Sequence, residues 1–127
     1  MIDDDEQPTV LASAMWWSED HAVVAVVSDA LAGRVLTRGS WHGVVVRSAR
    51  IVEEDAVARQ AAFEAFLRGV ASALTRIRVP GCPGGVLGVG ELRLHLALSG
   101  PELARGVLFD PDSLAVLLPF GLSLYVD

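Results

Sequence analysis

Residues Glu53 to Arg78, EEDAVARQAAFEAFLRGVASALTRIR, decide the fold of this chain. Their apolar side chains recur mostly at spacings of three and four residues, which places them along one side of a helix: Val57, Phe63, Phe66, Leu67, Val70, Leu74 and Ile77. A polar row repeats every four residues on the opposite side: Gln60, Glu64, Arg68, Ser72 and Arg76. The pattern therefore predicts a long amphipathic helix, and the rest of the chain must supply the surface that covers its apolar side.

The ends of this stretch carry the expected signals. The acidic run Glu53 to Asp55 suits a helix start, Arg76 and Arg78 suit a helix end, and Pro80 with Gly81 stops the helix. Two pairs lie one turn apart, Asp55 with Arg59 and Glu64 with Arg68. Each such pair is expected to stabilise the helix by about 0.3 kcal/mol.

The segments before the helix are harder to assign. Thr9 to Trp17 fits a strand or a short helix; on a strand, Trp16 and Trp17 point to opposite faces, so that one anchors the core and the other is half exposed. His21 to Ser28 contains four valines in eight residues, which favours a buried strand. A helix running as far as Ala32 is the competing interpretation, because the first glycine after this run is Gly33.

Two more strands are expected before the long helix. Gly33 can reverse the chain into a strand at Arg34 to Arg38, and Gly39-Ser40 breaks the chain again. Val44 to Val52, VVVRSARIV, is rich in β-branched residues and predicts a strand that leads directly into the helix.

The C-terminal third reads as an antiparallel meander. Pro80 to Gly90 holds five glycines and two prolines and predicts a loop. Glu91 to Leu98 alternates, with Leu92, Leu94, Leu96 and Leu98 on one face and Glu91, Arg93, His95 and Ala97 on the other. Arg105 to Phe109 and Leu114 to Leu118 flank a turn at Asp110 to Ser113, and a last strand alternates through Leu122, Leu124 and Val126.

Strands, a long helix and further strands together predict an α+β domain, with the helix packed across one face of a mainly antiparallel sheet. At 127 residues the chain is expected to form a single domain, residues 8–127. Residues 1–7, MIDDDEQ, form an acidic leader that is expected to be flexible.

Composition narrows the function classes. The formal charge is −6, which disfavours nucleic acid as a partner. The sequence has no uninterrupted apolar run of membrane-spanning length, so no membrane partner is expected. A single cysteine, Cys82, cannot close an intramolecular disulfide, and the acidic start differs from a signal peptide; both favour the cytoplasm.

The sequence contains no motif that names a reaction. The glycines from Gly84 to Gly90 lack the Gly-Lys-Ser/Thr ending of a phosphate loop, and Gly-x-Ser-x-Gly is absent. The three histidines have no metal-ligand spacing, and Cys82 has no sequence neighbour that lowers a thiol pKa. We therefore expect no catalytic residue, no metal site and no cofactor. The sequence leaves enzymatic activity open but favours its absence.

Candidate binding residues come from the mixed aromatic and basic positions. Trp41-His42 precedes a strand that carries Arg47 and Arg50, and aromatic residues with arginine are typical of binding hot spots. The alternative is that these residues only close the end of the core. The candidate set is Trp17, Trp41, His42, Arg47 and His95.

Two functions fit these observations. The first is a small acidic protein-binding module, of the immunity, chaperone or adaptor type, that acts by surface complementarity on a protein partner or on itself as a homodimer. Its acidic leader would then steer a basic partner. The second is a small-molecule-binding α+β domain, or a small enzyme, with a pocket between the long helix and the sheet.

Overall fold

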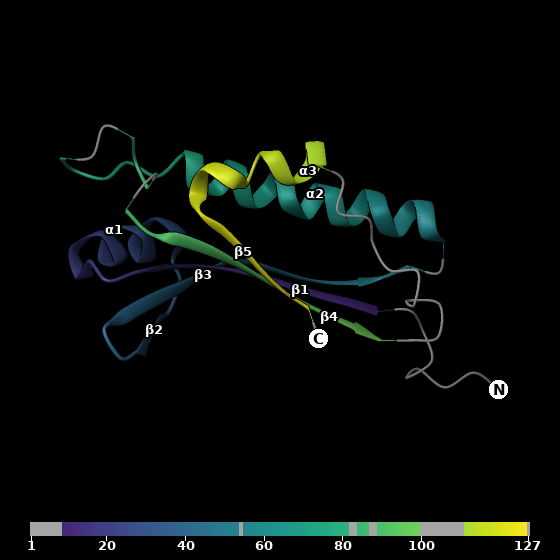
Figure 1. Cartoon of the computed structure of the whole chain (residues 1–127), viewed down its shortest axis with the longest axis horizontal. Coiled ribbons are helices and arrows are strands. Elements are labelled where there is room, and N and C mark those ends of the chain that lie inside the picture. The colour runs from purple at the N-terminus through teal and green to yellow at the C-terminus, as the bar shows by residue number, and fades with distance from the viewer. Residues whose placement is uncertain (1–8, 54, 82–83, 87–88, 100–110, 127) are drawn as a thin grey trace.

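A computed structural model describes residues 9–53, 55–81, 84–86, 89–99 and 111–126 (Figure 1). The domain is α+β, with a five-stranded, mostly antiparallel sheet and helices packed on it, as the sequence predicts. The elements in chain order are β1 (Thr9–Ser18), α1 (His21–Leu31), β2 (Val35–Arg38), β3 (Trp41–Val52), α2 (Ala56–Thr75), β4 (Glu91–Ser99), α3 (Pro111–Ala115), the 3-10 helix η3 (Leu118–Phe120) and β5 (Leu122–Val126).

The strands lie in the order β2-β3-β1-β4-β5. β1 is central and runs antiparallel to both of its neighbours, β3 and β4, while β2 and β3 form an antiparallel hairpin. β1 and β2 therefore run in one direction with β3 between them, and β3 and β4 run in the other direction with β1 between them. This is a double split β-α-β motif, the ferredoxin-like arrangement, to which β5 adds an outer strand.

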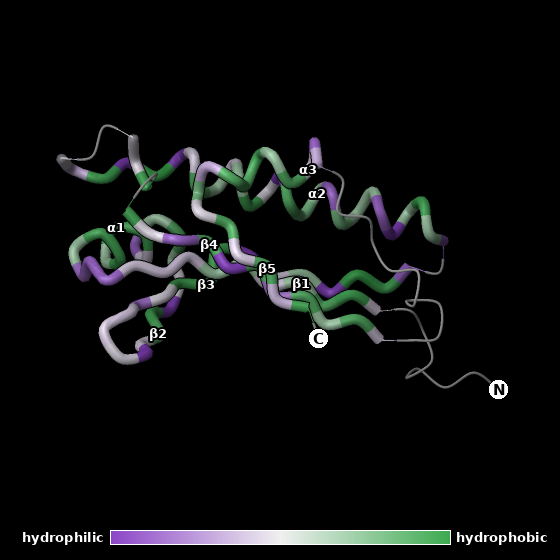
Figure 2. Tube along the Cα trace, in the orientation of Figure 1, coloured by the Kyte–Doolittle hydropathy of each residue, from purple (hydrophilic) through white to green (hydrophobic). Residues whose placement is uncertain are grey.

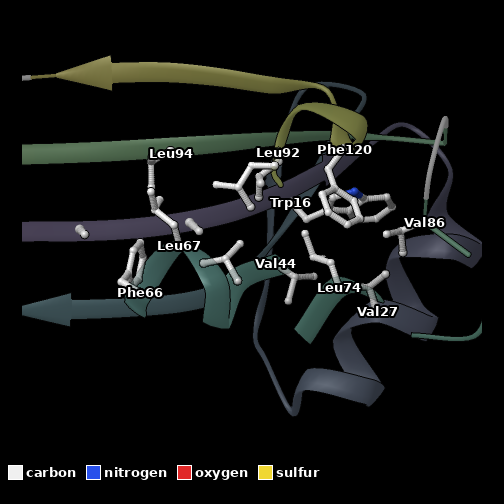
Figure 3. Close-up of a cluster of buried hydrophobic side chains, with 14 of the residues drawn as sticks. Trp16, Val27, Val44, Phe66, Leu67, Leu74, Val86, Leu92, Leu94 and Phe120 are labelled. Carbon is white, nitrogen blue, oxygen red and sulfur yellow. The ribbon is translucent and has the colours of Figure 1, made fainter. Parts of the chain in front are cut away.

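Both long helices pack on the same face of the sheet, which we call the covered face. Buried side chains of α1 and α2 join one core cluster with the side chains that β1, β3 and β4 turn towards them. Figure 3 shows Trp16 of β1 beside Phe120, Val86 and Leu74, with Val27 of α1 close by. The core therefore lies between the sheet and its helices, and it includes the fully buried Trp16.

The amphipathic stretch forms α2, and its predicted apolar stripe is buried at Phe63, Phe66, Leu67, Val70 and Leu74. Figure 2 shows hydrophobic and hydrophilic residues alternating along this helix. Ile77 is also buried, just beyond the helix end. Val57 is the exception, because it lies in the first turn and is 77% exposed.

The helix is shorter than the quoted stretch because capping sets its start. The Asp55 carboxylate accepts a hydrogen bond from the Ala58 amide at 2.8 Å, which satisfies one of the free donors of the first turn. Asp55 does not pair with Arg59. The buried Arg59 guanidinium instead donates to the Glu53 carbonyl oxygen at 2.9 Å. Glu64 likewise accepts hydrogen bonds from Gln60 and Ser113 rather than pairing with Arg68.

The prediction of a strand at His21 to Ser28 is wrong, and the competing helical interpretation holds. Asp20 caps the helix by accepting hydrogen bonds from the amides of Ala22 and Val23. Val23, Val24 and Val27 then fall on one helical face and are buried against the sheet. The packing of this face overrides the strand preference of valine. Ala32, in the left-handed conformation at φ 52°, ends the helix.

Around this helix, the strand alternative holds for residues 9–17, and the strands expected at Arg34 to Arg38 and at Val44 to Val52 are present. β2 covers most of Arg34 to Arg38, and β3 starts three residues before Val44. Trp16 and Trp17 point to opposite faces, but neither is half exposed: Trp17 is only 3% exposed. The predicted loop at Pro80 to Gly90 holds no helix or strand among its described residues.

The antiparallel meander predicted for the C-terminal third is wrong. β4 has the predicted alternation, with Leu92, Leu94 and Leu96 buried, but β5 pairs with it in parallel. The chain between them passes through α3 and η3, which gives the crossover that a parallel pair needs. Pro111 begins α3, a position that proline favours, so no strand forms at Leu114 to Leu118. The predicted strand at Arg105 to Phe109 lies outside the described residues.

Among the described residues, no helix combines the length and the apolar character needed to cross a membrane. The acidic leader, residues 1–7, and Cys82 lie outside the described part of the chain.

Candidate functional site

The second face of the sheet carries no helix of the described chain, and we call it the uncovered face (Figure 1). Strand alternation and register place on it Leu36 and Arg38 of β2; Trp41, Gly43, Val45, Ser48, Arg50 and Val52 of β3; Thr9, Leu11, Ser13, Met15 and Trp17 of β1; Glu91, Arg93, His95, Ala97 and Ser99 of β4; and Ser123 and Tyr125 of β5. Large apolar side chains are exposed here, including Leu11 at 49% and Tyr125 at 47%.

One end of the uncovered face is closed by stacked tryptophan and arginine side chains. Trp17 lies flat over Gly43 of β3, since a Cβ atom at Gly43 would come within 2.6 Å of the indole ring. The Arg93 guanidinium lies 4.9 Å from the Trp17 ring centroid and 5.7 Å from that of Trp41. Glu91 binds the same guanidinium, with Oε1 2.6 Å from Nη2 and 2.7 Å from Nε. This network fixes Arg93 and buries Trp17 on a face that no helix covers.

The middle of the uncovered face is hollowed into a groove of about 430 Å³. The groove crosses three strands and is lined by Leu11, Ala12, Ser13, Ser48, Ala49, Arg50, His95, Leu96 and Ala97. It exists because Ser13, Ser48 and Ala97, which point towards the solvent here, are small. Ser13 is directly opposite Ser48 on one side and His95 on the other.

A polar row therefore runs across the sheet. Ser48, Ser13, His95 and Tyr125 are register partners on β3, β1, β4 and β5. The His95 and Tyr125 rings stack, with centroids 4.8 Å apart and planes 10° from parallel. Stacking orients the imidazole at the groove's border, and the adjoining row, Arg50 opposite Leu11 opposite Ala97, adds one cation and two apolar groups.

Arg50 and Arg93 both lie on the uncovered face but differ in their interaction partners. Arg93 is engaged by Glu91 and two tryptophans, whereas the exposed Arg50 side chain has neither a hydrogen bond nor an ion pair with any described residue. Among its described residues, the face carries Arg38, Arg50 and Arg93 and one acidic residue, Glu91, while the whole chain has 10 basic and 16 acidic residues. The uncovered face thus has the opposite charge balance to the molecule.

The five candidate residues from the sequence divide between the two faces. Trp17, Trp41 and His95 lie on the uncovered face, with the two tryptophans at its closed end and His95 at the groove. His42 and Arg47 lie on the covered side of β3. His42 is buried, its ring centroid is 3.6 Å from that of His21, and its Nδ1 is 3.1 Å from the Thr37 hydroxyl.

Arg47 reaches the long helix. A Cβ atom placed on Gly69 of α2 would be 2.9 Å from the Arg47 guanidinium carbon, so the glycine leaves room for the guanidinium against the helix. A register shift between Ala14 and Met15 turns the β3 side chains after Val45, which puts Arg47 on the covered side and Arg50 on the uncovered one. Periodicity alone does not reveal this shift.

β2 begins at Val35, opposite Val44, so the outer side of β3 has no strand partner among the described strands from Val45 to Val52. Such an edge presents backbone donors and acceptors that can pair with another chain. It borders the groove through Ser48 and Arg50.

Within the described residues, no group of three or more His, Cys, Asp or Glu side chains is placed to hold a metal ion. A second hollow, of about 360 Å³, lies at the closed end of the sheet beside Trp41 and Glu91. Between α2 and the sheet, Phe63, Leu67 and Val70 are buried core residues at 1% exposure or less.

Sequence reasoning missed Leu11, Ser13 and Tyr125 as members of the site. The signal for β4 was present, since its alternation set Arg93 and His95 on one polar face. The pairing of β1 with β3 and β4 is what brings the serines beside His95. No family model, curated protein or solved structure matches this chain in the three comparisons made.

Proposed function

We propose that this chain is a small protein-binding module whose partner docks on the uncovered face of the sheet, without catalysis. The observation that carries the proposal is the exposure of large apolar side chains from four strands on one face: Leu11, Leu36, Val45, Val52 and Tyr125, all at 37% or more. Apolar groups that gather on one surface mark interaction sites, because burying them against a partner is favourable.

Two further features support a protein as the partner. The face is broad and only shallowly hollowed, which suits complementarity to a surface better than enclosure of a small ligand. Tryptophan, tyrosine and arginine, the residues enriched at binding hot spots, occur together on it at Trp41, Tyr125 and Arg50. Cytoplasmic localisation, expected from the single cysteine, is part of the same proposal.

The test compares two matched substitutions, Leu11→Arg on the uncovered face and Val57→Arg on α2. Both residues are exposed, so both variants are expected to fold. Affinity-tagged full-length protein is incubated with an extract of its source cells, and bound proteins are identified. In parallel, analytical ultracentrifugation of the purified protein over a range of concentrations measures self-association.

A partner, or a dimer, that is retained by Val57→Arg and lost from Leu11→Arg supports docking on this face. A complex that survives both substitutions moves the interface elsewhere and contradicts the proposal. The proposal is also contradicted if the protein is monomeric and retains no protein whose binding is lost from Leu11→Arg.

The groove favours a second candidate, small-molecule binding. A volume of about 430 Å³ falls within the range of ligand sites, on the order of 300–1,000 Å³. The position differs from the pocket expected between the long helix and the sheet. Ser13→Phe would fill the groove, so a small molecule that raises the melting temperature of the wild type and not of Ser13→Phe would favour this candidate over a protein partner.

A further inference from the structure

The groove on the uncovered face offers a specific chemistry. We infer that it receives an acidic side chain of the partner protein, carried on an extended segment that has apolar residues two positions before and after the acidic one. The inference rests on the proposed function, since it names the partner's chemistry at the same surface.

The first step is the state of Arg50. Its guanidinium stands at the border of the groove, exposed, and no described carboxylate binds it. The neighbouring Arg93 has the opposite status, because Glu91 and two indole rings already engage it. A carboxylate from outside would therefore find one available guanidinium at the groove, and guanidinium–carboxylate pairs form strong, directed hydrogen bonds.

The second step is the rest of the lining. Ser13, Ser48 and His95 form a row of hydrogen-bonding side chains across the groove, next to Arg50 on the same face. Ser13 and Ser48 make no hydrogen bond through their side chains with the described residues. Hydroxyl and imidazole donors beside a guanidinium suit the several acceptor positions of one carboxylate.

The third step concerns the groups that flank the carboxylate. Leu11 and Ala97 lie in the same row as Arg50, and Val52 and Tyr125 are exposed on either side of the groove. A ligand that carries only charge would leave these apolar surfaces in water. In an extended segment, residues two positions apart point to the same side, so an acidic residue with apolar residues two positions before and after it satisfies both parts of the lining.

Charge also selects against a second copy of this chain as the occupant. Two uncovered faces brought together around a two-fold axis would oppose surfaces that each carry three arginines and one glutamate among their described residues. Like charges facing each other across an interface are costly. The acidic leader predicted a basic partner, whereas the charge balance of the described residues at this face favours an acidic one.

The experiment uses three synthetic pentapeptides, Leu-Ser-X-Ser-Leu, in which X is glutamate, glutamine or lysine, blocked at both ends. Each is titrated into isotope-labelled full-length protein at low salt, and amide chemical shifts are followed by NMR. The variants are Arg50→Gln and, as the matched control, Arg76→Gln at the exposed C-terminal end of α2.

The glutamate peptide is expected to shift the amides of Ser13, Ser48, Arg50 and His95, and to bind about five-fold more tightly than the glutamine peptide. The lysine peptide should bind most weakly. Arg50→Gln should remove the preference for glutamate and Arg76→Gln should keep it. Raising the salt to about 0.5 M should reduce the preference, because an exposed ion pair is screened.

If the glutamate and glutamine peptides bind equally tightly at the groove, recognition of a carboxylate is contradicted, whereas the proposed protein-binding face is not. A weak complex has a dissociation constant of about 1 mM, so the titration extends to a peptide concentration of about 5 mM. If no amide at the groove shifts by then, the groove is not the binding site. The Leu11→Arg comparison then decides separately whether the face binds a partner at all.

Discussion

The two faces of one sheet differ in what covers them. On the covered face, Val10, Ala14 and Trp16 of β1 are fully buried under the helices. On the uncovered face of the same strand, Leu11 is 49% exposed, while Trp17 is 3% exposed and has the Arg38 and Arg93 guanidinium groups 6.0 and 4.9 Å from its ring centroid. The comparison teaches that burial on the first face comes from a second layer of structure, and on the second face from local side-chain stacking.

This difference has an energetic consequence. Side chains on the covered face stabilise the fold through the apolar area removed from water and through close packing. Those on the uncovered face contribute less to folding, so they are available for function. The predictions below test that division, beginning with the largest expected effect.

Leu67→Ala is expected to lower the free energy of unfolding by about 2–5 kcal/mol, because it leaves a cavity between α2 and the sheet. Leu67 is 1% exposed. Urea unfolding followed by far-UV circular dichroism measures the change, with the slope of the transition checked for two-state behaviour. A loss below about 1 kcal/mol would show that the core is loosely packed, and it would contradict the claim that the covered face contributes most of the stability.

Gly43→Ala is expected to lower the free energy of unfolding by about 1–3 kcal/mol, because the new methyl group meets the Trp17 ring and Arg93 hinders its retreat. The change is measured by urea unfolding. Near-UV circular dichroism should also change as the indole moves.

Gly69→Ala is the control for this prediction. Its methyl group would also meet a neighbour, at 2.9 Å, but that neighbour is the end of the exposed, flexible Arg47 side chain. Alanine also stabilises a helix interior by about 1 kcal/mol relative to glycine. We expect Gly69→Ala to be neutral or stabilising; equal losses for both variants would contradict the role given to Trp17.

Arg93→Gln is expected to lower the free energy of unfolding by about 1 kcal/mol, because two cation–π contacts and the partly exposed pair with Glu91 are lost. Acrylamide should quench the tryptophan fluorescence more strongly, because the Trp17 ring becomes more exposed. Unchanged quenching would mean that the strand pairing, and not Arg93, keeps Trp17 from solvent.

Leu11→Ala is expected to change the free energy of unfolding by only about 0.5 kcal/mol, since half of the side chain is already in water. It removes the same atoms as Leu67→Ala, so the ratio of the two losses measures the difference between the faces directly. A loss at Leu11 as large as that at Leu67 would show that another part of the chain covers the uncovered face in solution.

Much of the fold was readable from local patterns. The spacing of Phe63, Phe66, Leu67, Val70 and Leu74 predicted the buried side of α2, and the alternating leucines of β4 predicted its two faces. These succeeded because the period of a regular element is a local property of the chain. The helix at His21 was missed because the burial of its valines, which outweighs their strand preference, depends on the sheet beneath them.

The candidate site was readable only in fragments. Trp17, Trp41 and His95 were named from residue type, but Leu11, Ser13 and Tyr125 join the uncovered face through strand order and register. A single register shift in β3 sends Arg47 to the helix side and Arg50 to the groove. Sequence spacing within one strand carries no information on such long-range pairing.

By itself, the sequence determined an α+β domain with one amphipathic helix, because helical and strand periods and turn residues act over a few positions. Only the tertiary structure decided that α1 and α2 cover the same face, that β5 runs parallel to β4, and that Arg50, which pairs with none of the described acidic residues, faces the solvent beside apolar groups. The reason is that strand order and register are set by contacts between residues distant in the chain, such as Leu11 with Arg50 and with Ala97.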